Sequence, residues 1–174
     1  MLTKNFYNWL FSLATKKEIA NGYTDYTGAT ANAYPYTSMN SLSVIDNLHY
    51  LSIGTMSSSA YGVKLGTGVT PATFNDYTLE NVIIEGLSVA NQESILLNAE
   101  SDNSSVSATY SIKNISSEPI NISEIGLFNR AYVDGSTTRK LVLLERTVLE
   151  EPITIAPGQT KQITYTIRMN YPTA

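Results

Sequence analysis

Hydrophobic and polar side chains alternate along the second half of the chain, as they do in strands that bury one face. The clearest alternation runs from Val106 to Lys113, where Val, Ala, Tyr and Ile take turns with Ser, Thr and Lys. A second one covers Ile163 to Met169, after the turn sequence Ala156-Pro157-Gly158-Gln159. Short strands separated by turn signals, with no helical pattern between them, favour a mainly β fold, namely an antiparallel β-sandwich or jelly-roll-like domain.

Further strand signals precede and follow these segments. Tyr61 to Leu65 is strand-like, and Leu79 to Leu87 is an apolar run after a turn-rich loop. Alternation starts again at Ile120 and Ile122, but its phase shifts at Ile125. Such a shift is typical of a β-bulge or of a strand that changes sheets.

A hairpin is predicted around Asp134-Gly135. This dipeptide lies between two apolar segments, Ile125–Phe128 and Leu141–Leu149. Asp-Gly is a favoured hairpin sequence because both residues tolerate the left-handed backbone that tight turns require. We therefore expect the two segments to be neighbours in one sheet.

An amphipathic helix is predicted from Thr3 to Ala20, with Asn21-Gly22 as its stop signal. Four of its apolar side chains fall at helical spacing and form the candidate assembly interface: Phe6, Trp9, Leu10 and Leu13. A lone terminal helix must bury such a stripe on its own domain or on a neighbouring subunit. The sequence leaves both alternatives open.

The segment between Tyr23 and Tyr61 is rich in tyrosine and carries only two charged side chains, Asp25 and Asp46. It is either an arm that orders on assembly or a set of short strands that covers the core. Tyrosine rings also stack on sugars, so that a carbohydrate-binding face is a third interpretation.

The length of 174 residues fits one domain with an N-terminal appendage better than two full domains. We expect a helix in residues 1–22, a Tyr-rich arm or irregular β extension in residues 23–60, and a β-sandwich domain in residues 61–174. Because the strands carry their own apolar faces, this domain is expected to fold without the first twenty residues.

The composition favours a subunit of a larger assembly. Hydrophobic residues make up 43% of the chain and charged residues 15%, so uncharged polar groups and tyrosines must cover much of the surface. Such a surface costs less to dehydrate against a partner than a charged one. The net charge of -4 argues against direct nucleic-acid binding. The first apolar segment is too short for a membrane span, so we expect a cytosolic product.

The residues that common active sites require are missing or badly spaced. With no cysteine and one histidine, His49, neither a nucleophilic triad nor a zinc site is expected. Gly66-Thr67-Gly68 lacks the rest of a phosphate-binding loop, and Glu150-Glu151 would face opposite sides of a strand. The oxygen-rich group around Asp102 does not have EF-hand spacing. We therefore expect no enzymatic activity, no cofactor and no metal.

Four short motifs follow one another between residues 61 and 171. They are Gly66-Thr67-Gly68 with Thr70-Pro71, Glu124-Ile125-Gly126-Leu127-Phe128, Leu144-Glu145-Arg146-Thr147, and Ala156-Pro157-Gly158. In their order and spacing they resemble small structural proteins of tailed bacteriophage virions. The resemblance leaves the N-terminal third of the chain unassigned.

This resemblance implies a virion component, made in the host cytoplasm, that binds copies of itself and other virion proteins such as capsid, portal, neck or tail proteins. Proteins of this kind occur as head decorations, as neck or collar parts and in tail fibres. The alternative is a tail-fibre or receptor- or glycan-binding adhesin, whose binding face the Tyr-rich segment would supply. A β-sandwich hydrolase is disfavoured because no carboxylate pair or metal set is visible.

Three motif residues also have a physical interpretation of their own. Glu124 and Arg146 either pair across neighbouring strands, which would help to set their register, or are two separate solvated charges. Gly126 within a strand indicates a bulge or a close approach of the backbone.

Overall fold

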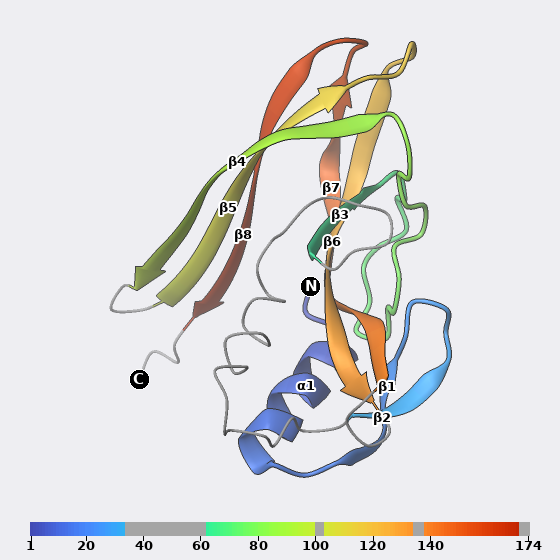
Figure 1. Cartoon of the computed structure of the whole chain (residues 1–174), viewed down its shortest axis with the longest axis vertical. Helices are drawn as coiled ribbons and strands as arrows, with labels where there is room; N and C mark the ends of the chain where they lie inside the picture. The colour runs from blue at the N-terminus through green and yellow to red at the C-terminus, as the bar shows by residue number, and fades with distance from the viewer. Residues whose placement is uncertain (34–61, 100–102, 134–137, 171–174) are drawn as a thin grey trace. The chain divides into compact units, whose positions relative to one another are not determined.

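The computed structural model describes residues 1–33, 62–99, 103–133 and 138–170, and the chain forms two compact units (Figure 1). Unit 1 consists of Met1–Ile84 and Ile122–Ile153, and unit 2 of Glu85–Asn121 and Thr154–Ala174. The expected mainly β class, with antiparallel sheets and one N-terminal helix, is confirmed.

Unit 1 contains the helix and a five-stranded sheet. Its elements are α1 (Lys4–Thr15), β1 (Ile19–Thr24), β2 (Thr30–Ala33), β3 (Gly62–Gly66), β6 (Ile120–Val133) and β7 (Thr138–Ile155). The strand order is β1-β2-β6-β3, and β7 also pairs with β6. In the register between β3 and β6, Val63 lies opposite Leu127. The two longest strands, β6 and β7, continue into unit 2.

The helix ends earlier than the sequence predicts. It stops at Thr15, because Lys16 adopts the left-handed conformation with φ 55°, which ends an α-helix. The predicted stop signal, Asn21-Gly22, lies instead within β1, where the pairing with β2 is irregular. A Cβ at Gly22 would lie 2.6 Å from the Cβ of Ala33, so glycine permits the close approach of β1 and β2 at this point.

Two asparagines fasten α1 to β1, and Figure 1 shows the helix beside β1 and β2. The Asn5 amide donates to Thr24 O at 2.8 Å and accepts from Thr24 N at 2.9 Å, and Asn8 donates to Gly22 O at 2.6 Å. Phe6, on the same helix, is buried. The helix, β1 and β3 belong to the same compact unit.

Unit 2 is a three-stranded antiparallel sheet of β4 (Leu87–Ala99), β5 (Asn103–Asn114) and β8 (Thr160–Asn170), in the order β4-β5-β8. The alternation predicted for β5 and β8 is confirmed, since one face buries Ala108, Tyr110, Ile112, Ile163 and Tyr165. On the other face hydroxyl groups pair across the strands, Ser107 with Thr166 at 2.8 Å and Thr109 with Thr164 at 2.9 Å.

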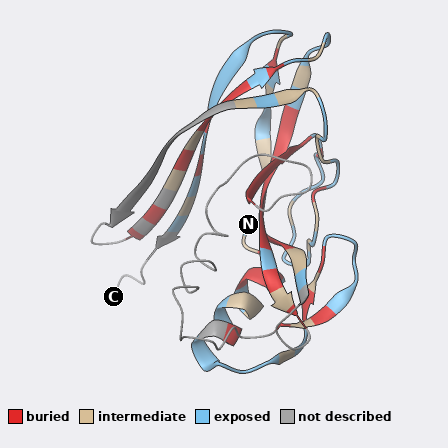
Figure 2. Ribbon diagram, in the orientation of Figure 1, coloured by how far each residue is buried: buried red, intermediate tan, exposed pale blue. Residues whose placement is uncertain are grey.

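The other strand predictions have mixed outcomes. The strand expected at Tyr61–Leu65 is β3, whereas the apolar run expected at Leu79–Leu87 forms bends with an isolated bridge between Gly66 and Val82. The phase shift at Ile125 lies in β6, whose residues 122–129 are all buried (Figure 2). Alternation fails there because both faces of the strand are covered. β6 and β7 pair as predicted, and Asp134-Gly135 lies outside the described residues.

Candidate functional site: a buried carboxylate and arginine network

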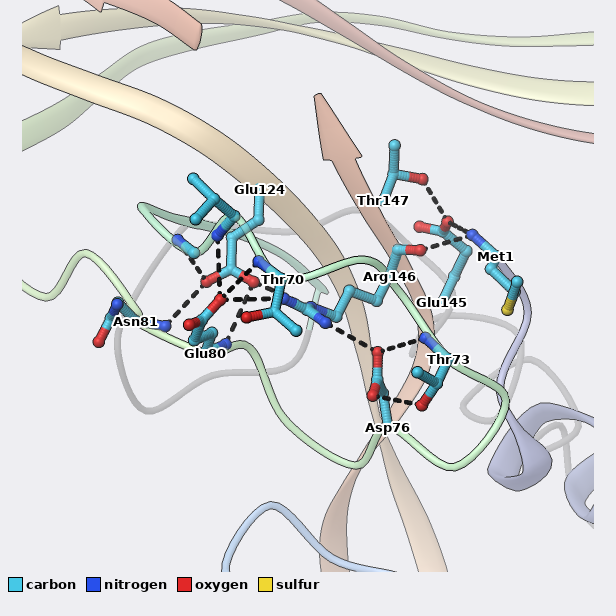
Figure 3. A network of polar contacts seen from close by, with 12 residues as sticks. Met1, Thr70, Thr73, Asp76, Glu80, Asn81, Glu124, Glu145, Arg146 and Thr147 are labelled. Carbon is cyan, nitrogen blue, oxygen red and sulfur yellow. Dashed lines mark hydrogen bonds and ion pairs between the residues drawn. The ribbon is translucent and has the colours of Figure 1, made fainter. Parts of the chain in front are cut away.

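Glu124 on β6 and Arg146 on β7 form a buried ion pair at the centre of a network of polar contacts in unit 1 (Figure 3). Arg146 Nε donates to Glu124 Oε2 at 2.9 Å, and the two residues are 4% and 0% exposed. The predicted pairing across neighbouring strands is therefore confirmed, and the alternative of two solvated charges is wrong. Burial makes this pair far more consequential than a surface ion pair.

The carboxylate of Glu124 is also held by backbone N–H groups of the loop between β3 and β4. Its Oε1 accepts from Gly68 N at 3.0 Å and from Asn81 N at 2.8 Å. Its Oε2 accepts from Glu80 N at 3.1 Å in addition to Arg146. These four hydrogen bonds compensate the cost of removing the charge from water. They also tie the loop to β6.

Gly66 and Gly68 of the Gly-Thr-Gly motif leave the space that the Glu124 carboxylate occupies. A Cβ at Gly68 would lie 2.6 Å from Glu124 Oε1, and a Cβ at Gly66 would lie 2.6 Å from Asn81 O. Both distances are shorter than real side chains tolerate, so any other residue would push the loop away from Glu124. The Gly-Thr-Gly sequence therefore allows the loop to pack against the buried Glu124 carboxylate.

At Gly126 the backbone oxygen of Glu145 lies 3.2 Å from where a Cβ would be, and leucine side chains come closer still. A Cβ at this position would lie 2.7 Å from Leu79 Cδ2 and 2.9 Å from Leu143 Cδ1. Leu79, Leu143 and Phe128 form a buried apolar cluster. The glycine in β6 therefore lets the loop leucine reach the core beside the ion pair.

The guanidinium of Arg146 reaches further acidic side chains of the same loop (Figure 3). Its Nη1 donates to Asp76 Oδ2 at 2.9 Å, and its Nη2 lies 3.7 Å from Glu80 Oε2. Asp76 in turn accepts from Thr73 N and Thr73 Oγ1, at 2.9 and 2.7 Å. Arg146 thus joins β7 to Glu124 on β6 and to Asp76 and Glu80 of the loop.

The first residues of the chain pair with β7 beside this network. Met1 and Arg146 exchange backbone hydrogen bonds, and the Met1 amino group contacts Glu145 Oε1 at 2.6 Å. The buried hydroxyl of Thr3 donates to Leu143 O at 2.7 Å. The segment that leads into α1 is therefore bonded to β7, with an isolated bridge between Leu2 and Glu145.

Three carboxylates of unit 1 have lowered pKa values. Burial alone would raise the pKa of Asp25, but hydrogen bonds from Lys140, Thr27 and Ala29 outweigh it and lower the pKa to about 2. For Asp76, burial is likewise outweighed by hydrogen bonds from Thr73 and Arg146, so its pKa is also lowered. Hydrogen bonds from Thr70 and Val69 lower the pKa of the exposed Glu80.

Acid is expected to destabilise the fold through these groups. Because the folded-state pKa of Asp25 lies below its ordinary value of 3.8, the stabilisation that this carboxylate contributes is present above about pH 4 and is lost as the pH falls toward 2. The lowered pKa values of Asp76 and Glu80 act in the same direction. For the buried Asp25, the shift from 3.8 to about 2 corresponds to on the order of 2 kcal/mol. Thermal unfolding of the Asp25→Asn variant and of the parent between pH 6 and 2 measures how much of the pH dependence of stability comes from Asp25. An equally steep pH dependence in both proteins would contradict the prediction.

The network is suited to holding the fold rather than to chemistry. Both oxygens of Glu124 accept hydrogen bonds from within the chain, and the residue is fully buried, so it is not placed to exchange protons with a substrate. Among the described residues, no group of three or more His, Cys, Asp or Glu side chains is arranged to hold a metal ion. Glu150 and Glu151 are exposed, while His49 and Asp102 lie outside the described ranges.

The candidate assembly interface is split by the fold. Phe6 is 9% exposed and Trp9 is half-buried, whereas Leu10 is 44% exposed. Nothing is described of the Leu13 side chain. Phe6 therefore packs within its own unit, whereas Leu10 lies on the exposed side of the helix.

Sequence reasoning missed three exposed aromatic residues. Tyr7 and Phe11 lie one turn apart on α1, and the Phe74 ring of the loop lies 5.8 Å from that of Tyr7. Together with Met1, Leu2, Lys4 and Asn8 they line a shallow depression of about 620 Å³. The spacing of Tyr7 and Phe11 was visible in the sequence, but the position of Phe74 depends on the fold of the loop.

Comparison with known proteins identifies no relative that would indicate a function for this chain. No protein-family model, curated protein or solved structure matches this chain. The buried network and the exposed apolar side of α1 are therefore the two features from which a function is inferred.

Proposed function

We propose that the protein is a non-enzymatic structural component of a tailed-bacteriophage virion that binds copies of itself and other virion proteins, such as capsid, portal, neck or tail proteins. The observation that carries the proposal is the exposed apolar surface of α1 and the neighbouring loop. Tyr7, Leu10, Phe11 and Phe74 are between 41% and 57% exposed. Clustered apolar side chains of this size mark interaction surfaces in soluble proteins.

The energetics of this surface favour association. Fully burying a large apolar side chain contributes about 1.5 to 3 kcal/mol before ordering costs. Because Asn5 and Asn8 fix α1 to β1, the helix backbone is already ordered, so that little backbone conformational entropy is lost when a partner covers it. Aromatic anchors on a rigid element are typical of protein–protein interfaces.

The motifs on which the phage resemblance rests hold a loop and a turn of the fold in place. Gly66 and Gly68 make room for Glu124, which pairs with Arg146. In the Ala-Pro-Gly turn, Gly158 has a φ of 74° and donates to Asn114 O at 2.9 Å. These residues stabilise a loop and a turn of the fold.

Mass spectrometry of purified particles of the phage that encodes the chain tests the proposal. We expect many copies per particle, because a structural subunit is present in the stoichiometry of the assembly. Treatment of the particles with protease and detergent before analysis controls for adhering host proteins. Complete absence from the particles would refute the proposal.

A tail-fibre or glycan-binding adhesin is the alternative proposal, and it rests on the Tyr-rich segment. Tyr23 is 1% exposed and so is unavailable to a sugar, whereas Tyr26 is 52% exposed. The remaining tyrosines of that segment up to Tyr61 lie outside the described residues. Purified protein that blocks phage adsorption would favour this alternative. Within the described ranges, the structure has no helix with the length and apolar character that a membrane span requires.

A further inference from the structure

Unit 1 contains a second site, a pocket of about 550 Å³ that shares no residue with the network around Arg146. Its lining comes from the turn after β1, from β3, β6 and β7, and from the loop before β4. The lining residues are Tyr26, Lys64, Thr78, Val82, Ile84, Phe128, Arg130, Arg139, Lys140 and Leu141.

The pocket gathers positive charge in an acidic protein. Four of the 11 lysines and arginines of the chain line it, although the chain has a net charge of -4. The described lining residues include no Asp or Glu. The nearby Asp25 binds Lys140 at 2.8 Å and also accepts hydrogen bonds from Thr27 and Ala29. A concave surface lined by one sign of charge attracts ligands of the opposite sign.

Two of the four cations contact aromatic rings. Lys64 is 7% exposed, and its Nζ lies 4.9 Å from the centroid of the Phe128 ring. Arg139 lies over the Tyr132 ring at 4.7 Å and donates to the Tyr132 hydroxyl. The exposed Arg130 and Arg139 offer planar guanidinium groups, which match a carboxylate with two parallel hydrogen bonds.

Four apolar residues make up most of the remaining lining of the pocket, namely Val82, Ile84, Phe128 and Leu141. Val82 and Leu141 pack against the buried cluster that includes Phe128, and Ile84 is 69% exposed. A ligand that fills this space must therefore place a negative group near the arginines and an apolar group against Val82 and Leu141. Of the described lining residues, Thr78 and Tyr26 supply the neutral hydroxyl groups. Two hydroxyl groups are few for binding the many hydroxyls of a sugar, so the lining favours a peptide over a glycan.

We propose that this pocket binds an acidic peptide segment of a partner protein, in which a carboxylate side chain stands beside an apolar one. The inference rests on the proposed function only for the source of the segment, since a virion subunit has several protein partners. The binding itself is a property of unit 1 and is measured on the full chain in solution.

Fluorescence anisotropy with a short labelled peptide of alternating Glu and Leu tests the inference. The full chain should bind it saturably, and should bind the same peptide with Gln in place of Glu at least about tenfold more weakly. The double variant Arg130→Gln/Arg139→Gln should lose about tenfold in affinity. The matched control is Lys113→Gln/Lys161→Gln, which removes two exposed cations of unit 2 and should bind within about twofold of the parent.

The outcomes separate the possible ligands. Absence of saturable binding, equal binding of the Glu and Gln peptides, or equal affinity of the two double variants would overturn the inference. Displacement of the peptide by an anionic polysaccharide at a lower concentration would also overturn it and assign the pocket to a glycan. Failure of the peptide to bind would leave the particle composition unchanged, so it is distinguishable from failure of the proposed function.

Discussion

Replacing Arg146 with methionine is expected to lower the free energy of unfolding by about 3 to 5 kcal/mol. Methionine keeps the apolar stem of the side chain but leaves Glu124 charged, fully buried and without its ion-pair partner. Asp76 loses its contact with the guanidinium as well. Removing one partner of a buried pair costs more than the pair contributes, because the remaining charge stays desolvated.

The measurement is thermal and denaturant unfolding followed by circular dichroism. For a chain of this size the melting temperature should fall by on the order of 10 °C. The matched control is Arg168→Met on the exposed side of β8, which should change stability by less than about 0.5 kcal/mol. Glu124→Gln should also be strongly destabilising, because its NH₂ group would face backbone N–H donors. An Arg146→Met protein that melts like the Arg168→Met control would contradict the central role of the network.

The sequence supports the prediction of features that arise from neighbouring residues. Alternation over Val106–Lys113 predicted β5 because one face of that strand is buried. The pairing of Glu124 with Arg146 was within reach because a hairpin signal between them predicted that their strands are neighbours. Gly126 in a strand likewise indicated a close approach, since glycine inside a strand otherwise weakens it.

Features that depend on distant contacts lay beyond sequence reasoning. Asp76 is 70 residues from Arg146, and a loop of mixed polar residues carries no periodicity that would place it beside β7. The basic pocket joins Lys64 to Arg130 and Arg139 through the strand order β2-β6-β3 with β7 on β6. Local patterns predict strands but not this order. The end of α1 was missed because Lys16, which has no strong C-cap preference, adopts the left-handed conformation.

Replacing Phe6 with alanine is expected to cost about 3 kcal/mol of stability, whereas the same change at Phe11 should cost less than about 0.5 kcal/mol. The two residues are identical in type and lie on the same helix, but Phe6 is 9% exposed and Phe11 is 57% exposed. Alanine is the best helix former, so neither change weakens α1 by itself. The difference between the variants therefore isolates the burial of one ring in unit 1.

The Phe6→Ala and Phe11→Ala variants also test which side of α1 contacts other subunits in an assembly. Phe6→Ala should lower the melting temperature of the purified protein, while Phe11→Ala should melt like the parent and yet reduce self-association or incorporation into particles. Unfolding curves measure the first effect, and analytical ultracentrifugation together with particle composition measures the second. If Phe11→Ala destabilised the isolated protein as much as Phe6→Ala, the assigned orientation of α1 would be incorrect. If Phe11→Ala melted and assembled normally, this side of the helix would not be the interface, and an assembly contact would have to lie on another surface.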